Sequence, residues 1–445
     1  MSSLALPALR IDALLAGDWA GGAVAAVVGY VTAFAAALLL SLLAGAEKLP
    51  VHATLAVVGS LVGAAFGGDV VGEVGASVVG GSGRIGAYPL TITVLSLTAL
   101  GVVFWHRLRS RRPGLGEALL QAVRTAVIFA VLLALSSLVL RYHGDLPGGI
   151  GQTSVHVGTA GSAVGGLLLS GLVCAAACLR KREWLPARVL AGRDAVAAPI
   201  AGLGVVFAVG CVLTLLGGVV VLLVDQDGAL RLTFAVLLGG LPNLMIWCLL
   251  GGTGTALIAH GSAGGSLVSQ FGTGSSASTH ITDAADANAW WWLVTVGAVL
   301  CLLVGALAVV YLSRSLERSR RTLIGFAVAY IVAAPILAHL ATLYVHGQVS
   351  GTDGSGGGSL GPSAGGAFAV AILAGFGAAV LALAIAPKLF TAPPAGRAVP
   401  PIGYGPATGS DRRPPPQQQP PPPPQYRATP PPTADPRLGP DAGQR

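Results

Sequence analysis

The sequence predicts an all-α polytopic membrane protein. The chain is 53% hydrophobic and only 10% charged, and its mean hydropathy is +0.76. Soluble domains carry about 25% charged residues, and only helices satisfy their own backbone polar groups in lipid. The skew towards Ala, Gly and Arg is typical of a GC-rich bacterial genome. We therefore expect a multi-pass protein of a bacterial plasma membrane.

Ten apolar segments follow one another along the chain. They span 20–44, 51–67, 88–106, 121–140, 159–179, 197–224, 232–250, 290–312, 322–344 and 366–386. Because about 20 residues are needed to cross the hydrocarbon core, eight of them qualify comfortably. Segment 51–67 is short, and segment 232–250 is interrupted by a Gly pair and Pro242.

One motif occurs twice and predicts the domain organisation. "RTAVIFAV" at 124–131 returns as "RTLIGFAV" at 321–328. Both stretches start an apolar segment that ends near Tyr, His and Gly. A Gly-rich stretch follows each, and then "SAVGG" at 162–166 or "SAGG" at 363–366. This common order predicts two tandem repeats of five segments, 20–193 and 197–390, after a cytoplasmic N-terminus at 1–19. The alternative is a chance likeness between apolar helices.

Basic residues predict the orientation. Arginines cluster at 107–112, 180–193 and 314–321, and the positive-inside rule places all three clusters in the cytoplasm. Three apolar segments separate the second cluster from the third, although an even number of crossings is required. We therefore expect 51–67 and 232–250 to be re-entrant or outer-surface elements, leaving eight crossings and both termini inside. In the alternative, ten segments cross, the repeats are inverted, and the third cluster and the C-terminus lie outside.

Two regions are candidates for binding a protein partner. The Pro-rich stretch 391–445 cannot build a packed core and is expected to be a disordered cytoplasmic tail. It could bind a protein partner through polyproline segments or act as a spacer. Trp290, Trp291 and Trp292 suit the outer membrane interface, with a partner-binding patch as the alternative. The lipid bilayer is the expected partner, and nothing indicates nucleic acid.

No motif indicates catalysis, a cofactor or a metal. "GSGRIG" at 81–86 and "GGSLG" at 357–361 match short enzyme patterns, but we expect both in loops, where those patterns do not function. The cysteines all lie within apolar segments and are interpreted as small core residues. We expect no enzyme activity.

The candidate binding residues lie on the outer side of the eight-crossing arrangement. If 51–67 and 232–250 do not cross, their irregular backbone must be buried in protein or face water. We expect an outer vestibule there, with Asn243 and Thr253 as polar contacts and with His143, His339 and His346 nearby. Histidines titrate near neutral pH and bind metals, although interfacial histidines usually do neither.

Three stretches carry a family resemblance. "YPLTITVL", "LLGGLPNLMIW" and "WWWLVTV" make the chain similar to the streptophobe family of actinobacterial integral membrane proteins. The resemblance implies a multi-pass plasma-membrane protein and supplies no catalytic residues.

The apolar segments carry almost no ionisable residues away from their ends, which argues against carboxylate-based proton coupling. We expect a non-enzymatic envelope scaffold or accessory subunit. The alternative is a transporter or channel for an unknown solute.

Overall fold

The computed structural model describes residues 18–76, 80–111, 114–145, 151–181, 185–224, 230–264, 275–280, 291–313, 316–350 and 354–390. Residues 1–391 form one compact unit, and residues 392–445 are assigned to a second one. The expected tail, Trp290 and almost all of the expected cytoplasmic N-terminus lie outside the described residues.

Helices make up most of the first unit. They are α2 (Trp19–Leu43), α3 (Val51–Ala65), α4 (Leu90–Arg111), α5 (Leu115–Val139), α6 (Thr159–Cys178), α7 (Ala187–Val224), α8 (Leu230–Gly239), α9 (Leu241–Gly252), α11 (Trp292–Ser313), α12 (Leu316–Leu340) and α13 (Ala364–Phe390). A short 3-10 helix, η1 (Ala46–Lys48), follows α2. Among the described residues, eight helices are long and apolar enough to cross a membrane: α2, α4, α5, α6, α7, α11, α12 and α13.

The two segments that the sequence singled out do differ from these eight helices. Helix α3 is apolar but has only 15 residues. The segment 232–250 is divided between α8 and α9, whose axes are bent by 75°. Pro242 lies in the first turn of α9, where a missing backbone N–H costs nothing because that group has no helical partner. The break therefore follows from the Gly-Gly-Leu-Pro sequence.

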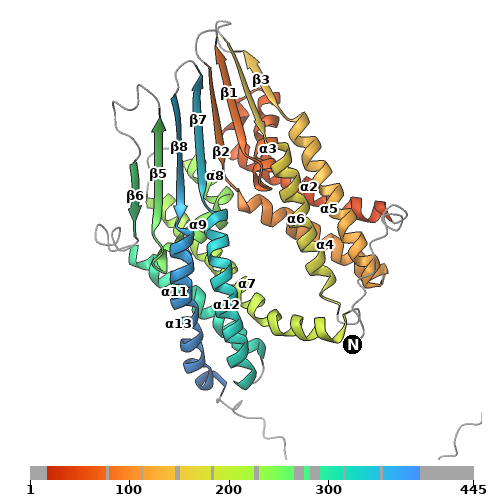
Figure 1. The fold of residues 1–445 in the computed structure, drawn as a ribbon, viewed down its shortest axis with the longest axis vertical. Coiled ribbons are helices and arrows are strands. Elements are labelled where there is room, and N and C mark those ends of the chain that lie inside the picture. Colours follow the sequence, from red (N-terminus) through yellow and green to blue (C-terminus); the bar gives the residue numbers. More distant parts are fainter. Residues whose placement is uncertain are drawn as a thin grey trace, which may run out of the picture. The chain divides into compact units, whose positions relative to one another are not determined.

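The all-α prediction is wrong in one respect, because the Gly-rich connections form strands. These are β1 (Val70–Ala76), β2 (Gly80–Gly86), β3 (Tyr142–Asp145), β4 (Gly151–Val157), β5 (Leu257–Gly264), β6 (Ser275–Thr279), β7 (Leu343–Ser350) and β8 (Gly354–Pro362). They pair antiparallel in one sheet of order β3-β4-β1-β2-β7-β8-β5-β6. Figure 1 shows the sheet at one end of the helices.

The strand order is the same in the two halves of the chain. The first half contributes β3-β4-β1-β2 and the second contributes β7-β8-β5-β6, so each half places its third and fourth strands before its first and second. The halves meet where β2 pairs with β7, from Gly80 opposite Ser350 to Gly86 opposite Tyr344. Every hairpin connects two neighbouring strands, and the seam between β2 and β7 joins distant parts of the sequence.

The two short enzyme-like patterns lie in strands instead of the expected loops. The "GSGRIG" string is most of β2, and the "GGSLG" string belongs to β8. Gly is depleted in strands, because it has a high conformational entropy to lose and no side chain to pack. Neither string connects a strand to a helix, so the reason for excluding both enzyme patterns still holds.

The repeated motif has a packing role in both helices where it occurs. Thr125 in α5 donates to the carbonyl of Gln121, and Thr322 in α12 donates to the carbonyl of Arg318. Phe129 and Phe326, four residues after these threonines, are fully buried in separate hydrophobic clusters. The same short sequence therefore places one hydroxyl and one aromatic ring inside each helical bundle.

Candidate functional site

The eight-stranded sheet has two chemically different faces. Directly paired residues of antiparallel strands point to the same face, and successive residues along a strand alternate. The register places Arg84 beside His346 on one face and Ile85 beside Val345 on the other. Carried across all strands, the first face, here called the polar face, holds Glu73, Arg84, His143, His156, His260 and His346, together with the apolar side chains of Val71 and Ile258. The opposite, apolar face holds Val70, Val74, Ile85, Leu343, Val345 and Leu360.

Large side chains on the apolar face are open to solvent in this structure. Val74 is 45% exposed, and Ile85 and Val345 are each 50% exposed. A row of small residues, Gly72, Gly83, Gly347 and Gly356, crosses four adjacent strands on the same face. The result is a surface on which apolar side chains lie on either side of a row of glycines. Extended apolar surface of this kind marks interaction sites more often than catalytic ones.

The predicted histidines do not converge on one site. His143 in β3 and His346 in β7 share the polar face, but β4, β1 and β2 lie between them. At about 4.8 Å between strands, four steps separate them by roughly 19 Å. His339, at the end of α12, instead contacts Tyr344, whose hydroxyl lies 3.1 Å from its Nδ1. Among the described residues, no group of three His, Cys, Asp or Glu side chains could hold a metal ion.

A polar group that the sequence did not single out lies at the foot of the seam. Asp69, just before β1, lies close to Gly86 at the end of β2, and Gly86 pairs with Tyr344 in β7. Burial of the Tyr88 hydroxyl raises its pKa, and the Asp69 carboxylate and Tyr344 raise it further. Asp69 and Tyr88 are brought together by the β1–β2 hairpin, whereas Tyr344 joins them through the pairing between the halves, which no local sequence pattern could have predicted.

Asn243 and Thr253 are both engaged in hydrogen bonds within the protein. The Oδ1 atom of Asn243 accepts from the backbone N–H of Leu90, 3.2 Å away, at the start of α4. Beside it, the Thr91 hydroxyl donates to the carbonyl of Leu238 at 2.7 Å. Thr253 ends α9, and its hydroxyl donates to the carbonyl of Leu250. Asn243 therefore lies at a second contact between the halves, where α4 of the first half meets the α8–α9 break of the second.

An ion pair also crosses between the halves. Arg231, in the first turn of α8, lies 2.9 Å from the carboxylate of Glu47 in η1. A hydrogen bond from its own backbone lowers the pKa of Glu47, and the Arg231 guanidinium lowers it further. Both side chains are exposed to solvent, so the contact orients the two segments more than it stabilises them.

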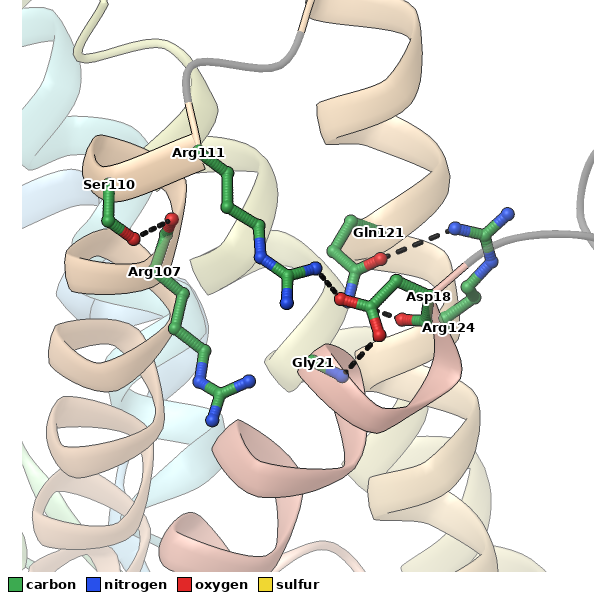
Figure 2. Close-up of polar contacts among 7 residues, drawn as sticks. All are labelled: Asp18, Gly21, Arg107, Ser110, Arg111, Gln121 and Arg124. Carbon is green, nitrogen blue, oxygen red and sulfur yellow. Dashed lines mark hydrogen bonds and ion pairs between the residues drawn. The ribbon is translucent and has the colours of Figure 1, made fainter.

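Asp18 links the ends of α2, α4 and α5 through hydrogen bonds and an ion pair (Figure 2). The Asp18 carboxylate caps α2 through the N–H of Gly21 and forms an ion pair with Arg111 of α4. Gln121 of α5 donates to the Asp18 carbonyl and accepts from Arg124 at 3.3 Å. Arg124 is only 3% exposed, so the arginine of the repeated motif is a buried charge in this half.

Comparison with protein-family models, curated proteins and solved structures finds no match to this chain. The geometry is therefore the basis for a functional assignment. The structure provides a broad sheet with one polar and one exposed apolar face, and a hydrogen-bonded seam between two similar halves. It offers a surface for binding, and its described residues assemble no metal cluster.

Proposed function

We propose that the protein is a multi-pass plasma-membrane scaffold or accessory subunit that acts without catalysis and binds a partner protein through its sheet. The observation that carries this proposal is the exposed apolar face, with Val74, Ile85 and Val345 open to solvent. Leaving such side chains in water is unfavourable, and covering them removes apolar area at a gain of about 25 cal/mol per Å².

The single sheet supports a count of eight crossings, with the described strands all on the same side of the membrane. Helices α6, α7 and the α8–α9 pair lie between β4 and β5, and both strands belong to one sheet. Two crossings return the chain to the side it left, whereas a third would put β5 on the opposite side of the membrane from β4. The bent α8–α9 pair then enters the membrane without crossing it or lies at its surface, and α3 does the same.

The positive-inside rule supports the direction of this arrangement. The arginine clusters lie at the end of α4, around the start of α7 and at the start of α12, and the connections next to them contain no described strand. With these connections in the cytoplasm, the sheet lies outside and both chain ends lie inside. Two tandem repeats in the same orientation account for the shared strand order, and membership of the streptophobe family is part of the same proposal.

The binding proposal is tested by matched substitutions on the two faces of the same strands. One variant carries Val74→Ser and Ile85→Ser on the apolar face. Its control carries Glu73→Ser and Arg84→Ser, the preceding residues, which lie on the polar face. Each variant is solubilised in mild detergent, and the co-purifying proteins are quantified.

The wild type and the polar-face control should recover the same partner in stoichiometric amount, and the apolar-face variant should lose it. Equal recovery by both variants, or no stoichiometric partner for the wild type, would contradict the proposal.

A further inference from the structure

The contact between β2 and β7 joins the two halves of this chain, and the same kind of contact can form between two chains. Strand β2 ends the first half of the sheet, and β7 begins the second half. By the shared strand order, β6 is the counterpart of β2, and β3 is the counterpart of β7. No described strand pairs with the outer edge of either β6 or β3. We propose that β6 of one copy pairs with β3 of a second copy, in the same way that β2 pairs with β7.

The counterpart residues follow from the register. Val70 pairs with Val157 next to a hydrogen bond from Gly158 N–H to the carbonyl of Asp69. In the second half, Leu257 pairs with Pro362 next to a hydrogen bond from Ser363 N–H to the carbonyl of Ala256. These two corners are equivalent, and they fix β1 against β5 and β4 against β8 without any sequence alignment.

The pair expected between copies is Ser278 opposite Asp145. Val71 pairs with Arg84, and its counterpart Ile258 pairs with Ser278, so Ser278 stands where Arg84 stands in the first half. Gln152 pairs with Asp145, and its counterpart Gly357 pairs with His346, so Asp145 stands where His346 stands. Because Arg84 pairs with His346 within the chain, Ser278 should pair with Asp145 of the next copy.

The membrane permits this repetition. The eight described strands lie in one sheet, so both halves have these strands on the same side of the membrane. A second copy placed by the same relation inserts in the same orientation as the first. An unpaired strand edge also offers backbone N–H and C=O groups that another strand can satisfy. Because the two edges differ, the contact is head-to-tail, and it generates a ring or an open row of copies.

Disulfide crosslinking tests the proposal in full-length protein from which the native cysteines have been removed. Differently tagged chains carrying only Ser278→Cys or only Asp145→Cys are co-expressed in one membrane and then oxidised. The matched control replaces Ser278→Cys by Thr279→Cys, which moves the cysteine one residue along β6 and places its sulfur on the opposite face of the sheet. A chain carrying both Arg84→Cys and His346→Cys monitors folding, because its crosslink should form within one chain.

We expect a covalent dimer containing both tags for Ser278→Cys with Asp145→Cys, and its loss for Thr279→Cys with Asp145→Cys. A chain carrying both Ser278→Cys and Asp145→Cys should form covalent multimers. A crosslink confined to a single chain would mean that the sheet closes on itself and would overturn the proposal. So would the absence of the mixed dimer while Arg84→Cys and His346→Cys crosslink normally. Neither result depends on whether the apolar face binds a partner.

Discussion

A hydrogen bond joins Asn243 of the second half to Leu90 of the first half, with 3.2 Å between the amide oxygen and the backbone nitrogen. Leu90 begins α4, and the first N–H groups of a helix have no partner within it. The side chain of Asn243 therefore satisfies one of these groups from a different half of the chain.

Replacing Asn243 should measurably weaken the helix contact between the two halves. Asn243→Ala leaves the Leu90 N–H without its acceptor, and we expect a loss of about 0.5–1.5 kcal/mol in the free energy of unfolding. Asn243→Asp keeps an acceptor oxygen at the same place and should lose less. Unfolding of the purified protein in mild detergent, followed by circular dichroism, measures both variants. Equal stability of Asn243→Ala and the wild type would contradict a stabilising role for this hydrogen bond.

The two arginines of the repeated motif should respond differently to substitution. Arg124 is buried and bonded to Gln121, whereas Arg321 is exposed. Arg124→Ala removes a charged hydrogen-bond donor, and we expect it to cost roughly 1.5–3 kcal/mol in the free energy of unfolding. Arg321→Ala should stay within about 0.5 kcal/mol of the wild type, as is usual for surface substitutions. The same detergent unfolding assay compares them, and equal losses would contradict the difference in burial.

The sequence was informative about the helices and much less so about the sheet. Apolar runs of about 20 residues are a strong signal, and the interruption before Pro242 correctly marked the break between α8 and α9. Strands β2 and β8 gave a weak signal, because most of their residues are Gly or Ser and show little apolar alternation.

The expected vestibule residues show a further limit of sequence reasoning. His143 and His346 are far apart in the sheet because their positions depend on strand order, and the spacing of residues along one chain does not encode that order. Asn243 was singled out for its place at an irregular helix break, and the structure gives it a hydrogen-bonding role there.

Removal of the Pro-rich region should leave the membrane part intact. Residues 391–445 contain few large apolar side chains, and helix α13 ends at Phe390. We expect a chain truncated after Phe390 to reach the membrane fraction in the same amount as the full chain and to unfold at the same temperature in detergent. A lower yield of folded protein would mean that the removed region packs against the helices.

Labelling of single cysteines should place the sheet and the arginine clusters on opposite sides of the membrane. Gln348 and Ser355 are exposed strand residues, and Ser110 and Arg320 are exposed residues at the other ends of α4 and α12. In a background without the native cysteines, a membrane-impermeant maleimide added to intact cells should label Gln348→Cys and Ser355→Cys. Ser110→Cys and Arg320→Cys should react only after the cells are opened, because eight crossings leave both in the cytoplasm.

The informative comparison is between the two cytoplasmic positions. Ten crossings would leave Ser110→Cys protected but would expose Arg320→Cys to the reagent in intact cells. That arrangement would also put β2 and β7 on opposite sides of the membrane, roughly 30 Å apart, although they pair directly and paired strands lie only about 4.8 Å apart. Labelling of Arg320→Cys in intact cells would therefore contradict both the crossing count and the common location of the eight strands.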